Sequence, residues 1–119
     1  MSINKNTKSE LFLTEEDLGI KALMRKYSPY FTVTKEIKIY QGYLASIETM
    51  LKRFAETKNT KLVPNIVRIT SDSYRLDFQG FFPNKFSIIV QQTIVSSSHK
   101  CYKCGAFIKN KRSDLCICD

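Results

Sequence analysis

The sequence predicts an α+β fold in which two N-terminal helices pack on a small antiparallel sheet, followed by a C-terminal module that holds all the cysteines. Three observations lead to this prediction. Apolar residues recur every three or four positions in the first half of the chain, which is typical of amphipathic helices. They alternate with polar residues at positions 74–79, which is typical of a strand with one buried face. The four cysteines all lie within the last nineteen residues.

We assign residues 1–98 to the α+β domain, with residues 1–10 as a flexible arm, and residues 99–119 to the cysteine module. A chain of 119 residues is long enough for one such domain to bury a core. No apolar run reaches the roughly 20 residues of a membrane span, so we expect no membrane contact. The polar first residues lack the apolar centre of a signal peptide. We therefore expect an intracellular, cytoplasmic protein whose thiols stay reduced.

Both predicted helices lie before residue 57. The first is expected to span residues 14–26, with Thr14 as its N-terminal cap. The second is expected to begin between residues 35 and 42 and to end near Glu56. Apolar side chains between Ile37 and Phe54 are spaced by three and four residues, which places them along one helix face. That face either packs against the sheet, as we expect, or forms a short coiled coil with another chain.

The second half of the chain is predicted to form two or three antiparallel strands. Residues 66–70 and 86–95 are rich in β-branched and apolar side chains, and residues 74–79 alternate between apolar and polar. The helices would cover one face of this sheet. The last connection contains Phe81 and Phe82, which either fold back into the core or stay exposed as a contact for a partner.

The cysteines are arranged as a Cys-x-x-Cys-Gly sequence followed, after a basic stretch, by Cys-x-Cys. Two short segments that bring thiolates together match the tetrahedral coordination of a structural zinc ion. Residues two apart in an extended strand point the same way, so the closely spaced second pair can still face one ion. We predict a Zn²⁺ site, with a disulfide pair as the alternative, and with His99 as a possible replacement for one cysteine. The predicted ligands are Cys101, Cys104, Cys116 and Cys118.

Residues 101–118 resemble a zinc ribbon, although Cys116-Ile117-Cys118 is one residue shorter than the usual second Cys-x-x-Cys pair. The resemblance implies a structural metal site and transfers no substrate or reaction. Ribbons of this kind often contact nucleic acid or other proteins.

Several observations argue against an enzyme. Four thiolates fill the zinc tetrahedron and leave no open coordination position for catalysis. A redox role for Cys101 and Cys104 is disfavoured because no βαβ pattern surrounds them. The sequence contains no Gly-rich phosphate loop, nucleophile elbow or histidine-based catalytic pair. We therefore predict a non-catalytic protein.

The net charge of +8 favours polyanionic partners. Basic and aromatic side chains alternate around the first cysteine pair, where cations can neutralise phosphates and rings can stack on bases. The lysines could instead offset the negative charge of a four-thiolate zinc site. We predict contact with nucleic acid, or with a protein of the transcription or replication machinery. The predicted contact residues are Lys100, Tyr102, Lys103, Lys109, Lys111 and Arg112.

The alternative function is that of a protein-interaction factor, such as an inhibitor, an adaptor or an assembly component, including a small viral protein. In that case zinc is purely structural. The partner would then be contacted by the helix between Ile37 and Phe54, or by the Phe81-Phe82 pair.

Overall fold

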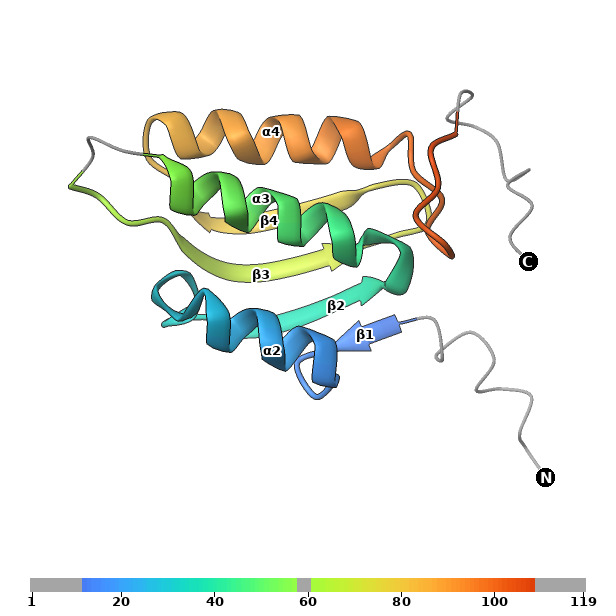
Figure 1. Ribbon diagram of the computed structural model, residues 1–119, viewed down its shortest axis with the longest axis horizontal. Coiled ribbons are helices and arrows are strands. Elements are labelled where there is room, and N and C mark those ends of the chain that lie inside the picture. Colours follow the sequence, from blue (N-terminus) through green and yellow to red (C-terminus); the bar gives the residue numbers. More distant parts are fainter. Residues whose placement is uncertain (1–11, 58–60, 109–119) are drawn as a thin grey trace.

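The computed structural model describes residues 12–57 and 61–108. These residues form a four-stranded sheet, in the order β1-β2-β3-β4, with helices packed against it (Figure 1). None of the described helices is long and apolar enough to cross a membrane. In chain order the elements are β1 (Phe12–Thr14), α2 (Leu18–Lys26), η2 (Ser28–Phe31), β2 (Glu36–Tyr40), η3 (Gln41–Tyr43), α3 (Leu44–Glu56), β3 (Asn65–Ser71), β4 (Leu76–Phe81) and α4 (Lys85–Ser97).

The sheet is mixed. β1 runs antiparallel to β2, with Phe12 opposite Tyr40, whereas β2 and β3 are parallel and α3 connects them. β3 and β4 form an antiparallel hairpin. In its turn, Asp72 Oδ1 accepts hydrogen bonds from the backbone N–H groups of Tyr74 (2.7 Å) and Arg75 (3.1 Å). Such a side-chain acceptor is what turn chemistry predicts for Asp.

The predicted order of two N-terminal helices on an antiparallel sheet is wrong. A strand precedes each of the first two helices, and the parallel β2–β3 pair makes the sheet mixed. The error came from residues 36–40. Ile37 and Tyr40 fit a helical spacing, but Ile37 and Ile39 are both buried while Glu36 and Lys38 are exposed, which is the period of a strand. The early part of the predicted second helix is therefore β2.

The predicted strand at residues 86–95 is also wrong, because Lys85–Ser97 forms α4. Its β-branched composition favoured a strand. In the structure the buried residues of α4 recur at helical intervals, and two of them are polar. They are Phe86, Ile89, Val90, Thr93 and Ser97.

Other elements are confirmed. α2 ends at Lys26 as predicted, but it begins at Leu18 rather than at Thr14. The cap is Asp17, whose Oδ2 accepts hydrogen bonds from the N–H groups of Gly19 (2.9 Å) and Ile20 (3.2 Å). The predicted strands at 66–70 and 74–79 correspond to β3 and β4.

One hydrophobic core joins the helices to the sheet. The apolar stripe of α3 is buried in it, so the prediction that this face packs within the domain is confirmed, and no apolar seam is left there for a coiled coil. The Phe54 ring lies 5.2 Å from that of Phe86 and 6.3 Å from that of Phe82, measured between centroids. Phe82 therefore folds back onto the core, whereas Phe81 remains 52% exposed.

Candidate nucleic-acid interface

Residues 99–108, which we call the cysteine loop, lie at the end of the sheet where β2 runs into η3 (Figure 1). The backbone N–H of Gly42 donates a 2.8 Å hydrogen bond to the carbonyl of Tyr102, and Gln41 Nε2 donates one of 3.1 Å to the carbonyl of Lys103. The Cys101 side chain is only 3% exposed. These contacts fix the loop against the domain.

Within the loop the chain turns back on itself. Gly105 donates its N–H to the carbonyl of Cys101 (2.7 Å), and Cys101 donates to the carbonyl of Ala106 (2.8 Å). Gly105 has φ = +81°, a conformation that side chains other than glycine rarely adopt. The turn that the Cys-x-x-Cys-Gly sequence predicts is therefore present.

The turn carries two of the four predicted metal ligands, Cys101 and Cys104. The backbone N–H of Lys103 donates to Cys101 Sγ, at 3.3 Å from the nitrogen. Cys104 lies on the same turn and is exposed. The other two predicted ligands, Cys116 and Cys118, lie outside the described residues. Among the residues that are described, no three His, Cys, Asp or Glu side chains are grouped to hold a metal.

Three aromatic rings meet where the loop contacts the sheet. Phe12 of β1 stacks on Tyr40 of β2, with centroids 4.1 Å apart, and Tyr102 meets Tyr40 edge-on at 4.6 Å. We call Phe12, Tyr40 and Tyr102 the aromatic cluster. Each ring is partly exposed. Because these residues come from three separate segments, the cluster exists only when the cysteine loop is in place.

Two exposed lysines flank the aromatic cluster. Lys38 Nζ lies 5.0 Å from the centroid of Phe12, and Lys103 Nζ lies 5.6 Å from that of Tyr102, within the range of cation–π attraction. Within residues 12–57 and 61–108, neither lysine forms an ion pair with a carboxylate. Their charge therefore remains available to an anionic ligand.

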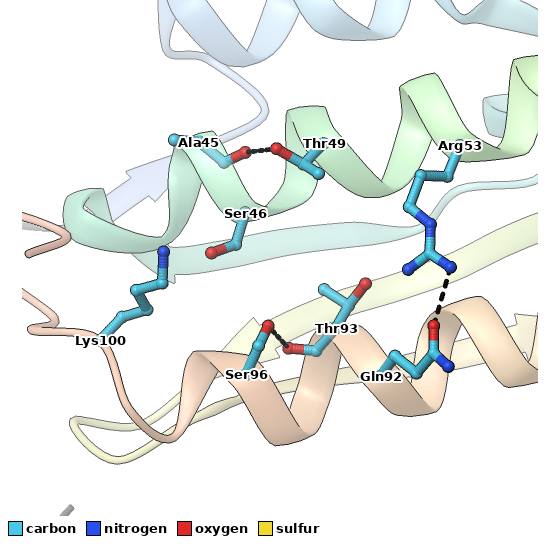
Figure 2. Close-up of a pocket in the computed structure, with 8 residues that line it drawn as sticks. All are labelled: Ala45, Ser46, Thr49, Arg53, Gln92, Thr93, Ser96 and Lys100. Atoms are coloured by element: carbon cyan, nitrogen blue, oxygen red, sulfur yellow. Dashed lines mark hydrogen bonds between the residues drawn. The ribbon is translucent and has the colours of Figure 1, made fainter. Parts of the chain in front are cut away.

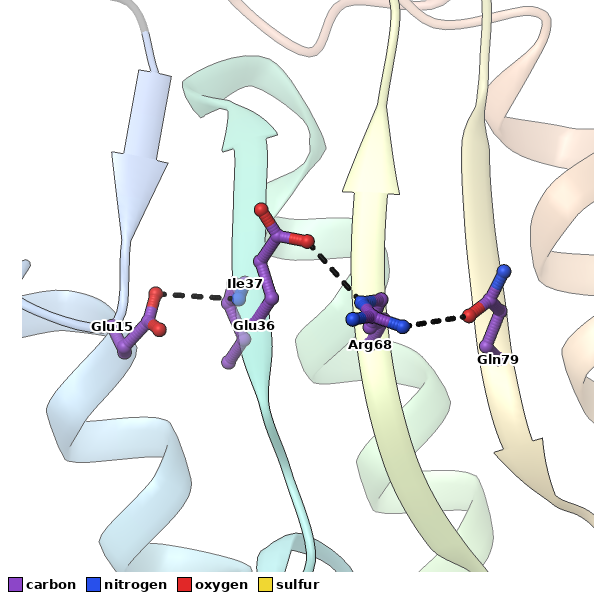
Figure 3. A network of polar contacts seen from close by, with 5 residues as sticks. All are labelled: Glu15, Glu36, Ile37, Arg68 and Gln79. Atoms are coloured by element: carbon purple, nitrogen blue, oxygen red, sulfur yellow. Dashed lines mark hydrogen bonds and ion pairs between the residues drawn. The ribbon is translucent and has the colours of Figure 1, made fainter.

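Beyond the cluster, Arg68 on the polar face of the sheet is paired with a carboxylate, whereas Asp77 of β4 is exposed there and forms no ion pair within the described residues. Arg68 Nε lies 3.3 Å from Glu36 Oε1, and Arg68 Nη1 donates to Gln79 Oε1 at 3.5 Å (Figure 3). At the start of β2, Glu15 Oε1 accepts from the N–H of Ile37 at 3.3 Å. Among the described residues, Lys38 is thus a cation of this face that forms no ion pair, and it lies beside the aromatic rings.

The predicted nucleic-acid residues do not all lie at one place in the structure. Tyr102 and Lys103 belong to the aromatic cluster and its rim, whereas Lys100 lines a separate groove between α3 and α4. The remaining three predicted residues, at positions 109, 111 and 112, lie outside the described residues. His99, the alternative ligand, stacks its ring on Phe107 at 6.2 Å.

Sequence reasoning missed Phe12, Lys38 and Tyr40. The available signal was the alternation in residues 36–40, which puts Lys38 and Tyr40 on one face once the segment is recognised as a strand. No local signal pointed to Phe12, because its place beside Tyr40 depends on the register of β1 and β2.

Tyr43 lies beneath the cysteine loop with its side chain fully buried. Its Oη has no hydrogen-bond partner among the described residues. Burial raises the pKa of Tyr43 above its usual value of 10.0, and the negative charge of Asp72 adds to this effect.

Tyr43→Phe is therefore expected to change how stability depends on alkaline pH. Above pH 10 an unfolded tyrosine ionises while folded Tyr43 keeps its proton, so the folded state binds more protons and loses stability as the pH rises. One such group contributes a slope of up to about 1.4 kcal/mol per pH unit. Urea unfolding of both proteins between pH 9 and about pH 11 checks this. If the free energies of unfolding of the two proteins changed with pH in parallel, Tyr43 would ionise as readily in the folded state as in the unfolded one.

Comparison of the chain with models of known protein families, with curated protein sequences and with solved structures gave no significant match in any of the three. The functional interpretation therefore depends on the contacts of the residues described above.

Proposed function

We propose that this protein is a non-catalytic binding module that contacts single-stranded nucleic acid through the aromatic cluster and its two flanking lysines. One observation carries the proposal: Tyr102 of the cysteine loop meets Tyr40, which stacks on Phe12. Lys38 and Lys103, which form no ion pair within the described residues, lie beside these rings. Single strands are bound by rings that stack on bases and by cations that follow the phosphates. A duplex hides its base faces, so stacking of this kind favours a single strand.

We also propose that Cys101, Cys104, Cys116 and Cys118 bind one structural Zn²⁺. The tight turn at Gly105 and the N–H directed at Cys101 Sγ support this assignment. A zinc ion held by four thiolates would crosslink the chain and leave no open position for chemistry. Its role would be to fix the loop that presents Tyr102 and Lys103. An intracellular, cytoplasmic location agrees with such a site, because thiols stay reduced there.

Tyr102→Ala is expected to weaken the binding of an oligothymidine of about eight nucleotides. Loss of one stacked base corresponds to about 1–3 kcal/mol, or roughly a 5- to 150-fold rise in Kd. Lys38→Gln should lower the slope of log K against log salt by about 0.7, the value for one phosphate contact to a single strand. Fluorescence anisotropy at several salt concentrations measures both effects.

Matched control substitutions lie at the end of the sheet away from the aromatic cluster. Phe81→Ala removes an exposed ring that is opposite Asn65 at the far end of the sheet, and Lys85→Gln removes a charge at the start of α4. Neither change should alter affinity or salt slope. Wild-type protein that fails to bind the oligonucleotide at low salt would overturn the proposal.

The alternative, a contact with a protein such as a component of the transcription or replication machinery, is favoured by one observation. Phe81 remains 52% exposed although its neighbour Phe82 packs on the core. Binding through an apolar contact depends little on salt, whereas binding to phosphates weakens steeply as salt rises. A partner whose binding is insensitive to salt and is lost in Phe81→Ala would favour this function.

A further inference from the structure

A groove lined by several polar side chains lies between α3 and α4, on the side of the molecule where Lys100 lies (Figure 2). Its volume is about 280 Å³, just below the range of about 300–1,000 Å³ that is typical of drug-sized ligands. None of its lining side chains carries a carboxylate. The side chains that matter for its chemistry are Ser46, Thr49, Arg53, Gln92, Ser96 and Lys100.

We infer that this groove binds a phosphate group. Arg53 and Lys100 supply positive charge from opposite ends of the groove, and Figure 2 shows Ser46 and Thr49 on the α3 wall between them. Within the described parts of the chain, neither cation forms an ion pair with a carboxylate. Two like charges held around one space without a counter-ion attract an anion.

Arg53 is held in position across the groove. Its Nη2 donates a 2.8 Å hydrogen bond to Gln92 Oε1, which ties the guanidinium of α3 to α4 (Figure 2). The other N–H groups of the same fork remain able to donate. A guanidinium that is already oriented loses less conformational freedom when it binds an oxyanion. The pair therefore prepares one rim of the groove for an acceptor ligand.

The charged groups of the groove are donors, namely the remaining N–H groups of Arg53 and the Lys100 ammonium. The hydroxyls of Thr49 and Thr93 already donate to the backbone carbonyls of Ala45 (3.0 Å) and Ile89 (2.8 Å). The carbonyls of Ser96 and Ser97 accept hydrogen bonds of 3.0 Å from the N–H groups of His99 and Lys100, and that of Thr93 accepts from Ser96 Oγ at 3.2 Å. Ser46 Oγ, by contrast, makes no hydrogen bond within the described residues. Two cationic lining side chains without a carboxylate disfavour a metal cation and suit a ligand with acceptor oxygens.

A phosphate meets this requirement because its oxygens can accept from an arginine fork, an ammonium or a hydroxyl. Such a group can come from a nucleic-acid backbone or from a free phosphate. Lys100 lies two residues before Tyr102, so their Cα atoms are at most about 7 Å apart. A single strand bound at Tyr102 could therefore also reach the groove. If the phosphate belongs to a nucleic-acid backbone, the inference rests on the proposed function.

The test is an NMR titration of the full-length chain with two probes, inorganic phosphate and the oligothymidine. Saturable shifts are expected at the amides of Ser46, Arg53 and Lys100. Arg53→Gln should weaken this binding by roughly 10-fold or more, the usual range for a hydrogen bond to a charged group. Lys52→Gln is the matched control, because Lys52 is the exposed neighbour on α3 and does not line the groove.

The two probes distinguish the source of the phosphate. Saturation by inorganic phosphate that Arg53→Gln weakens assigns the groove to a free phosphate group. Shifts with the oligonucleotide alone, together with a salt slope lowered by about 0.7 in Arg53→Gln, assign it to a backbone phosphate. Groove signals that neither probe moves, or that move equally in Arg53→Gln, overturn the inference. Oligonucleotide shifts confined to Tyr40 and Tyr102, with no groove shift from inorganic phosphate either, would overturn the inference while leaving the proposed function standing.

Discussion

Gly42→Ala is expected to detach the cysteine loop from the domain. A Cβ atom at this position would overlap the carbonyl oxygen of Cys101 and lie 2.5 Å from the carbonyl carbon of Tyr102. Both are backbone atoms, so no side-chain rotation can relieve the overlap. The substitution would also strain the 2.8 Å hydrogen bond from Gly42 N–H to the Tyr102 carbonyl. We expect the free energy of unfolding to fall by about 1–3 kcal/mol, the usual cost of overpacking.

Two measurements check this expectation. Urea unfolding gives the loss of stability, and the proton shifts of the Tyr40 ring report whether Tyr102 still lies 4.6 Å away. The control is Gly19→Ala in α2, where the new Cβ would meet only side-chain atoms, the nearest being Asp17 Oδ2 at 3.1 Å. Alanine is the better helix former, so that change should leave stability equal or higher. Unchanged stability and Tyr40 shifts in Gly42→Ala would show that the loop does not depend on Gly42.

Local patterns predicted several elements with an apolar buried face, but not β2, in which Ile37 and Ile39 are buried. The α3 stripe, with Ile47, Leu51 and Phe54 at helical spacing, was recognised, as were β3 and β4. α4 was not recognised, because its exposed side includes Ile88 (56% exposed) and Val95 (60%) while its buried side includes polar residues. Packing against the sheet and α3 decides its conformation, and a single sequence does not display those contacts.

The candidate interface was predictable only in part, because some of its residues meet only through long-range contacts. Tyr102 and Lys103 are neighbours in the sequence, so their pairing of ring and cation is a local feature. Phe12 and Tyr40 join them through strand register and through the contact between η3 and the cysteine loop. Those are long-range contacts, set by the antiparallel register of β1 and β2 and by the hydrogen bonds of Gly42 and Gln41 to the cysteine loop. Because residues 36–40 were assigned to a helix, the prediction lacked the surface on which Tyr102 lies.

Cys101→Ser is expected to abolish zinc binding. A serine hydroxyl does not ionise at neutral pH, so the variant would offer three thiolates in place of four. Elemental analysis should give about one zinc per wild-type chain and much less in the variant. Structural zinc sites bind with about 10–16 kcal/mol at neutral pH, so a chelator should lower the melting temperature of the wild type only. His99→Ala is the control and should retain zinc, because the His99 ring stacks on Phe107.

Cys101→Ser also tests whether the oligonucleotide interface depends on bound zinc. If zinc fixes the cysteine loop, its loss should remove Tyr102 from Tyr40 and raise the Kd for the oligonucleotide about as much as Tyr102→Ala does. Phe12 and Tyr40 would still stack, because strand pairing holds them without the loop. Zinc-free Cys101→Ser that kept full affinity would mean that the contacts of Gly42 and Gln41 suffice to hold the loop. Wild-type protein that contains no zinc when purified without chelators would remove the metal site altogether.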